Sequence, residues 1–216
     1  MGIERVSVKL RYRKEKIVMK RRIGIMIIFC MLLSVSSVFS LEIIGTLSYW
    51  YSNSSSIDQW EFTPTYSIYR AGYVPATKAQ TMSSAFSTWE YYANVKSSYT
   101  ASNGNITGYI YNRNDIRSLV PTLPDIATAV TYNGRSYTGQ GFDTSMGIKN
   151  YYTMTYSKIY VVNESAGDMT YFHEVGHALG WEGHSSNSND VMYGNAAYRN
   201  ATGLSSRDIN HLKQIY

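Results

Sequence analysis

The chain contains the run His173-Glu174-Val175-Gly176-His177-Ala178-Leu179-Gly180-Trp181-Glu182-Gly183-His184. Residues four apart in an α-helix lie on one face, one turn above the other. A helix through the start of this run therefore points the imidazoles of His173 and His177 toward a common point. Three of the four histidines in the whole chain fall within this run. The clustering predicts a metal site carried by a helix.

A third ligand is predicted from the residues that follow the helix. The periodicity predicts a helix from Asp168 to Gly180, because glycine tolerates the left-handed conformation in which helices often end. The chain can then turn back and bring His184 to the same ion. Three protein ligands plus a water molecule are typical of catalytic zinc sites, whereas structural sites are closed. We therefore predict one Zn²⁺ with three ligands, His173, His177 and His184.

Glu174 is the predicted catalytic residue. It lies beside the first ligand on the neighbouring side of the helix, where its carboxylate can reach a metal-bound water without binding the metal. A carboxylate in that position can act as a general base. The pattern thus predicts hydrolysis by attack of an activated water.

The surrounding sequence predicts both helices and strands. Apolar residues recur at helical spacing over Ala76–Val95, and Ser205–Ile215 begins with a capping serine. Strand-like segments are Tyr66–Tyr73, Ile106–Tyr111, Ile126–Tyr132 and Ile159–Asn163. Helices mixed with strands on a chain of this size predict a single α/β layered domain.

The first forty residues have the three parts of a secretory signal peptide. Nine Lys or Arg precede Ile23, an apolar run extends to Val38, and a small residue, Ser40, ends the segment. We therefore expect a signal peptide over 1–40 and a secreted, extracellular protein. An uncleaved anchor, which would make this a membrane-bound enzyme, is the alternative. After cleavage we expect no stable membrane association.

The charge balance changes once this leader is set aside. The whole chain has 20 Lys and Arg and 15 Asp and Glu, a net charge of +5. Nine of the bases and two of the acids lie in 1–40, which leaves 11 bases and 13 acids, or about −2. Charge therefore gives no support for nucleic-acid binding. The single cysteine, Cys30, also lies in the leader, so the exported part carries no thiol.

The run from His173 to His184 resembles the zinc signature of the metzincins, which is followed by a Met-turn. Two further segments resemble the matrixin branch of the metzincins, Asp190-Val191-Met192-Tyr193 and the closing segment Leu204–Tyr216. This branch includes the catalytic domains of matrix metalloproteinases. The chain resembles a secreted, bacterial-type member of it. The resemblance implies a metzincin-like zincin of the α/β (α+β) class. Its expected parts are a twisted mixed sheet with an antiparallel edge strand near Ala127–Tyr132, an active-site helix and a C-terminal helix.

The same resemblance implies the function and the domain organisation. We expect a zinc metalloendopeptidase, monomeric, that hydrolyses extended polypeptide substrates by Glu-assisted attack of zinc-bound water, with Met192 as the hydrophobic floor under the ligands. Asp208 resembles the terminal-helix acid that braces the Met-turn, although a first-turn acid also favours the helix dipole. Ca²⁺ is common in the family, and loops such as Asn112–Asp115 permit it. Residues 41–61 are expected to be a linker or short pro-segment, and 62–216 the catalytic domain.

Two departures from the family pattern leave alternatives open. Gly183 stands where the third histidine is expected, and His184 comes one residue later. The rival third ligand is Asp190, because Asp190 to Gly194 echoes the Asp-x-x-Tyr-Gly of aspzincins. The pro-segment of the family blocks zinc with a cysteine, which a carboxylate of Asp58 or Glu61 could replace here.

Two further interpretations concern the protein as a whole. His211 is left over from the cluster and is expected on the surface of the terminal helix. A function of a different class, a zinc-binding secreted or adhesion protein without turnover, would keep the metal but show no proteolysis.

Overall fold

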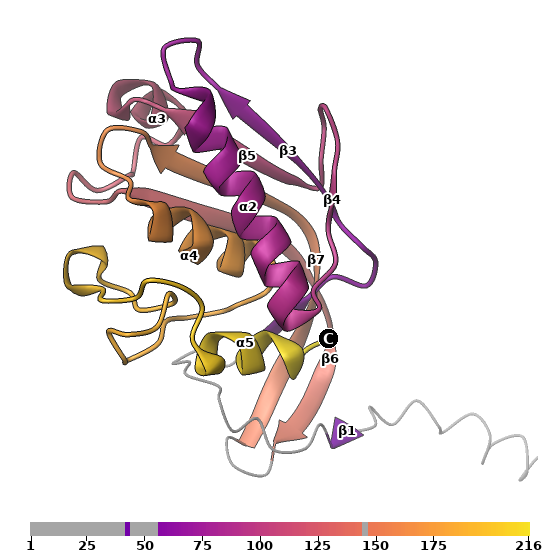
Figure 1. Ribbon diagram of the computed structural model, residues 1–216. Helices are drawn as coiled ribbons and strands as arrows, with labels where there is room; N and C mark the ends of the chain where they lie inside the picture. Colours follow the sequence, from indigo (N-terminus) through magenta and orange to yellow (C-terminus); the bar gives the residue numbers. More distant parts are fainter. Residues whose placement is uncertain (1–41, 44–55, 144–146) are drawn as a thin grey trace, which may run out of the picture. The chain divides into compact units, whose positions relative to one another are not determined.

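A seven-stranded mixed sheet is the framework of the computed structural model, which describes residues 42–43, 56–143 and 147–216 (Figure 1). The strand order is β1-β6-β7-β5-β3-β4, and β2 also pairs with β7. The strands are β1 (Glu42–Ile43), β2 (Ser56–Gln59), β3 (Thr65–Arg70), β4 (Ser98–Tyr99), β5 (Ile106–Tyr111), β6 (Ala129–Asp143) and β7 (Gly147–Val162).

The long strand β7 connects the parallel and antiparallel parts of this sheet. It pairs in parallel with β5 along one half and with β2 along the other, and β6 runs antiparallel to it. The mixed α/β architecture that the sequence predicts is confirmed. The edge position expected for the antiparallel strand near Ala127–Tyr132 is not confirmed for β6 as a whole, because β1 pairs with the far end of β6, at Gly141 and Phe142.

The helices are α2 (Ala76–Ala93), α3 (Arg113–Leu119), α4 (Asp168–Ala178) and α5 (Ser206–Lys213), with a 3₁₀ turn, η1, at Ala196–Tyr198. Helices α2 and α4 lie side by side on one face of the sheet (Figure 1). On that face Ile159 and Val161 of β7 join a core that includes Trp89 of α2 and Val175 of α4.

The opposite face carries a smaller second core. Side chains of successive strand residues alternate between faces, and Tyr160 and Val162 of β7 accordingly pack with Ile116 of α3. Both faces of the central strands are therefore covered. Helix α4, which carries His173 and His177, packs against both the sheet and α2.

The segment 41–61, expected to be a linker or pro-segment, contributes to this framework. Strand β2 lies within it, and Trp60 is buried in the main core. The predicted signal peptide lies outside the described residues. Within the part of the chain that the structure describes, no helix combines the length and the hydrophobicity needed to cross a membrane.

Candidate active site and metal centre

Helix α4 brings the two predicted ligands together. The Nε2 atoms of His173 and His177 lie 3.1 Å apart, as expected for side chains one helical turn apart. One ligand atom from each of His173, His177 and His184 lies within 4.8 Å of the others. Imidazole nitrogens are common zinc ligands, so the donor set fits a zinc ion.

The backbone around α4 selects the nitrogen that each ring presents. Nδ1 of His173 lies 2.8 Å from the carbonyl oxygen of Val191, and Nδ1 of His177 lies 2.7 Å from that of Trp181. A carbonyl only accepts hydrogen bonds, so both Nδ1 atoms donate and both Nε2 atoms keep a lone pair. Burial lowers the pKa of His177 to about 4 and that of His173 well below its ordinary value. Both rings are therefore neutral at physiological pH, the form that binds metals.

Two glycines return the chain to the site. Gly180 and Gly183 have φ values of +109° and +79°, which residues with a side chain rarely adopt. The positive φ of Gly183 accommodates the additional residue before His184. The ring of His184 then lies 5.2 Å from that of His173 and 5.0 Å from that of His177, between centroids.

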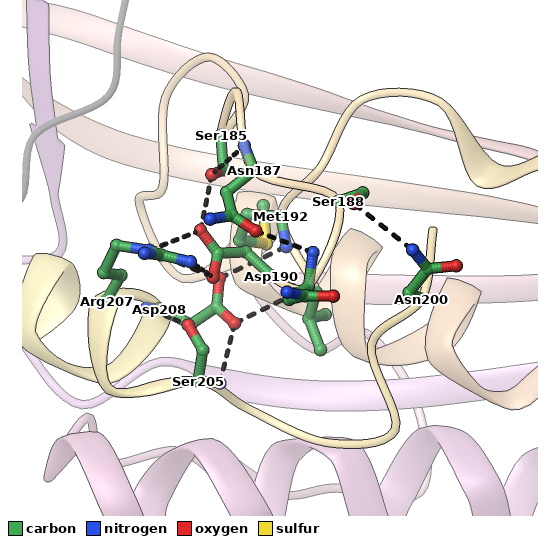
Figure 2. Close-up of polar contacts among 11 residues, drawn as sticks. Ser185, Asn187, Ser188, Asp190, Met192, Asn200, Ser205, Arg207 and Asp208 are labelled. Carbon is green, nitrogen blue, oxygen red and sulfur yellow. Dashed lines mark hydrogen bonds and ion pairs between the residues drawn. The ribbon is translucent and has the colours of Figure 1, made fainter. Parts of the chain in front are cut away.

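Asp190, the rival third ligand, is held elsewhere. Its buried carboxylate accepts hydrogen bonds from Arg207, with a shortest distance of 2.8 Å, and from the hydroxyl of Ser185 at 2.5 Å (Figure 2). These contacts tie the loop after His184 to α5. Asp190 is not part of the three-histidine cluster.

The Met-turn residues lie beneath the helix. Met192 is fully buried, and its sulfur lies 2.6 Å from the position that a Cβ on Gly176 would take. The carboxylate of Asp208 accepts hydrogen bonds from the backbone N–H groups of Val191 and Met192 at 2.9 and 3.3 Å. It also completes a capping box with Ser205 at the start of α5. The carboxylate of Asp208 therefore contacts the Met-turn and also lies in the first turn of α5, so the two interpretations from the sequence are compatible.

Glu174 faces the cleft and has one polar side-chain partner that the sequence did not indicate. The hydroxyl of Thr131 on β6 donates to its carboxylate at 2.6 Å. Burial raises the pKa of Glu174 to about 7, although this hydrogen bond and the charge of Arg199 lower it. Thr131 lies on a strand predicted from the sequence, but its pairing with α4 depends on how the sheet packs.

A cavity of about 1380 Å³ contains the cluster. Its lining includes the segment 126–133, which ends in the first half of β6, and residues of the loop 194–202 after the Met-turn. His173, Glu174, His177 and His184 line the same cleft. A molecule bound in the cleft can therefore reach the histidine cluster and Glu174.

One expectation about a single residue is wrong. His211 is fully buried and stacks on Trp181 with ring centroids 3.6 Å apart, because α5 packs against the turn that follows α4. The two carboxylates considered as replacements for a blocking cysteine have other partners. Asp58 is fully buried and its carboxylate lies 2.8 Å from Arg135 of β6, and Glu61 accepts a hydrogen bond from Thr153.

Comparison with known proteins places the chain in a family. The matrixin family model matches residues 58–216. No curated protein matches the chain significantly. Similar solved structures include high choriolytic enzyme 1, a hatching-enzyme zinc protease from the medaka fish Oryzias latipes, with 12% identity over 73% of this chain and 94% of that one and a TM-score of 0.37.

Two structures of myroilysin are similar at 14% identity, covering 79% and 82% of this chain and 97% and 92% of theirs, with TM-scores of 0.36 and 0.38. The identities and TM-scores of these structures are low, and the family assignment rests on the match to the matrixin model. That match spans strands β3 to β7, α4 and the histidine cluster. This chain therefore belongs to the matrixin family and is a zinc metalloendopeptidase.

Proposed function

We propose that the protein is a secreted endopeptidase in which His173, His177 and His184 hold the zinc ion and Glu174 acts as general base. The observation that carries this proposal is the convergence of the three imidazoles beside a buried carboxylate. Both α4 histidines use Nδ1 for backbone hydrogen bonds and leave Nε2 for the metal.

Zinc at these ligands would supply a Lewis acid that lowers the pKa of water toward about 7 and polarises a carbonyl group. Glu174 takes the proton of the attacking water and passes it to the amine of the leaving peptide. The hydroxyl of Thr131 orients the carboxylate for this transfer. The backbone of β6 from Ala129 to Asn133 lines the cleft and can pair with an extended peptide, which gives affinity with little sequence preference.

The ligand assignment is tested by metal content and casein cleavage in three variants. We expect Glu174→Gln to keep one zinc per chain and to lose activity by about 10²–10⁴-fold, the usual contribution of a general base. His184→Ala should lose zinc. Asp190→Ala should keep it, because Arg207 and Ser185 engage that carboxylate. Zinc retained by His184→Ala but lost by Asp190→Ala would reverse the assignment of the third ligand.

Secretion is proposed from the basic and apolar pattern of residues 1–40. The test is mass spectrometry of the protein recovered from the culture medium. We expect a product that lacks residues 1–40. An intact N-terminal segment found only in the membrane fraction would instead support the anchored alternative.

A further inference from the structure

The lining of the cleft includes a cation that the proposed mechanism does not use. Arg199 is half-buried and lines the cavity. Its Nη1 donates to the carbonyl of Met169 at 3.1 Å, and its Nε and Nη2 donate to the carbonyl of Tyr193 at 3.3 and 3.0 Å. Met169 lies one turn before His173 on α4, and Tyr193 directly follows Met192. The guanidinium is thus fixed beside the histidine cluster from two sides.

The charge of Arg199 is not balanced by an ion pair. Among the described residues no carboxylate lies within ion-pair distance of it. The second arginine that lines the cavity, Arg135, differs in this respect, because it pairs with Asp58 at 2.8 Å and with Glu182 at 3.6 Å. Burial lowers the pKa of Arg199, and the more distant charges of Glu174 and Asp208 offset this effect only in part.

The hydrogen-bonding capacity of Arg199 is also incomplete. A guanidinium has five N–H donors, and three of them form the bonds to Met169 and Tyr193. The two remaining donors have no acceptor among the described residues. Carboxylates are the preferred partners of arginine, since a charge-assisted hydrogen bond is about twice as strong as a neutral one.

The neighbouring helix end favours the same ligand. Residues 167–170, the first turn of α4, line the cavity beside Arg199. The N-terminus of a helix carries a partial positive charge that stabilises anions. The carboxylate of Asp168 lies in this turn but is exposed, so it screens the site only weakly.

We propose that Arg199 is a specificity-determining residue, which makes the cleft prefer peptides with an Asp or Glu side chain close to the bond that is cleaved. This inference rests on the proposed peptidase function and names its substrate class. The competing role for Arg199 is purely structural, because it also connects the Met-turn loop to α4. A structural role would affect all substrates equally, whereas recognition of a carboxylate affects only acidic ones.

The test begins with cleavage of a mixed peptide library by the zinc-loaded protein, and mass spectrometry of the products identifies the preferred position. Peptide pairs that differ only as Asp against Asn, or Glu against Gln, at that position are then compared by kcat/KM. We expect the acidic peptide to be preferred at least about tenfold, as for a hydrogen bond to a charged group. If the wild-type protein shows a kcat/KM ratio of one for the peptide pairs at every peptide position, the inference is overturned.

Substitutions then test whether Arg199 produces the preference. Arg199→Met should bring the ratio close to one, and Arg199→Lys should restore part of it. Arg70→Met is the matched control, because Arg70 also donates to backbone carbonyls, those of Ala71 and Val74, and does not line the cavity. If Arg199→Met lowers kcat/KM for both peptides by the same factor and leaves their ratio unchanged, Arg199 has only a structural role.

Binding of the same pairs to zinc-loaded Glu174→Gln separates this inference from the proposed function. Fluorescence anisotropy should show tighter binding of the acidic peptide, and Arg199→Met should remove the difference. If this preference is found while wild-type protein cleaves no peptide, the peptidase function fails and the inference stands. If wild type cleaves peptides but binds both members of each pair equally, only the inference fails.

Discussion

At the scale of single residues, the hydroxyl of Thr131 is the contact that fixes the carboxylate of Glu174, the proposed general base. It donates to the side chain of Glu174 at 2.6 Å and also contacts the carbonyl of the same residue at 3.2 Å. One side chain thus connects the strand that lines the cleft to the helix that carries two of the histidines. The orientation of the Glu174 carboxylate depends on this connection.

We expect Thr131→Val to lower kcat by about 10–100-fold. A hydrogen bond to a charged group contributes about 1.5–3 kcal/mol, and each 1.36 kcal/mol corresponds to a factor of about ten in rate. Zinc content should not change, because Thr131 does not contact the histidines through any hydrogen bond. Thr131→Ser keeps the hydroxyl and serves as the control. Wild-type kcat in Thr131→Val would show that Glu174 is oriented by other contacts.

The sequence predicts some residues of the site well and others poorly. His173 and His177 follow from helical spacing alone, whereas His184 depends on the backbone conformation of Gly180 and Gly183. The burial of His211 could not be predicted, because it results from packing against Trp181, which lies 30 residues earlier in the chain. Local patterns therefore predict which side chains of one helix lie together, whereas tertiary packing decides the positions of the others.

At the scale of elements, α4 fits closely against its neighbours at Gly176. A Cβ there would lie 2.6 Å from the sulfur of Met192 and 3.0 Å from Trp89 of α2. Both side chains are fully buried, so they have little room to move. The helix can approach α2 and the Met-turn only because this position has no side chain.

We expect Gly176→Ala to destabilise the protein despite the higher helix propensity of alanine. The gain in propensity is about 1 kcal/mol, while overpacking of a close-packed core costs about 1–3 kcal/mol. Thermal unfolding measures the net change. Gly203→Ala is the control, because a Cβ there would meet no atom within 4 Å. Equal melting temperatures for wild type and Gly176→Ala would contradict the prediction.

The loop between His184 and α5 is connected to that helix by a pH-sensitive contact. Burial raises the pKa of Asp190, but the hydrogen bonds from Arg207, Ser185 and Ser205 outweigh this effect and hold the pKa below its ordinary value. A carboxylate with a lowered pKa in the folded state stabilises it at pH values above its unfolded pKa. This contribution is lost as the pH falls through the folded pKa.

Asp190→Asn should therefore lower the free energy of unfolding at pH 7, by about 1–3 kcal/mol, as for a buried group left without its partner. In acid the difference from wild type should diminish. Urea unfolding at pH 7 and at low pH, with a chelator present so that zinc release does not contribute, measures both values. Glu90→Gln, an exposed substitution on α2, should change stability by no more than about 0.5 kcal/mol. A deficit in Asp190→Asn that is the same at both pH values would argue against an ionised Asp190.

At the scale of the whole molecule, Trp60, which directly follows β2, and Tyr216 meet at the end of α4. The indole N–H of Trp60 donates to the carbonyl of Ala178 at 2.9 Å, and the hydroxyl of Tyr216 donates to that of Leu179 at 2.7 Å. The backbone N–H of Trp60 donates in turn to the Tyr216 hydroxyl at 3.1 Å. These contacts hold the end of α4, where the chain turns toward His184.

A protein that begins at Phe62 should consequently be less stable than one that begins at Leu41. It lacks β2, Trp60 and the buried partner of Arg135, Asp58. Circular dichroism should show a lower melting temperature, and zinc affinity should fall with it. Ser-to-Ala changes within 44–55 serve as the control for the sequence upstream of β2. A Phe62 form with wild-type melting temperature and activity would show that 41–61 is dispensable, as the sequence suggests.

The span of these contacts also bears on how the protein folds. The hydrogen bond between Trp60 and Tyr216 joins residues 156 positions apart in the sequence. Contacts of such long range slow folding, because the entropy of closing the loop is lost before the contact forms. The support behind the three histidines therefore forms at a larger cost in chain entropy than the helical turn that aligns His173 with His177.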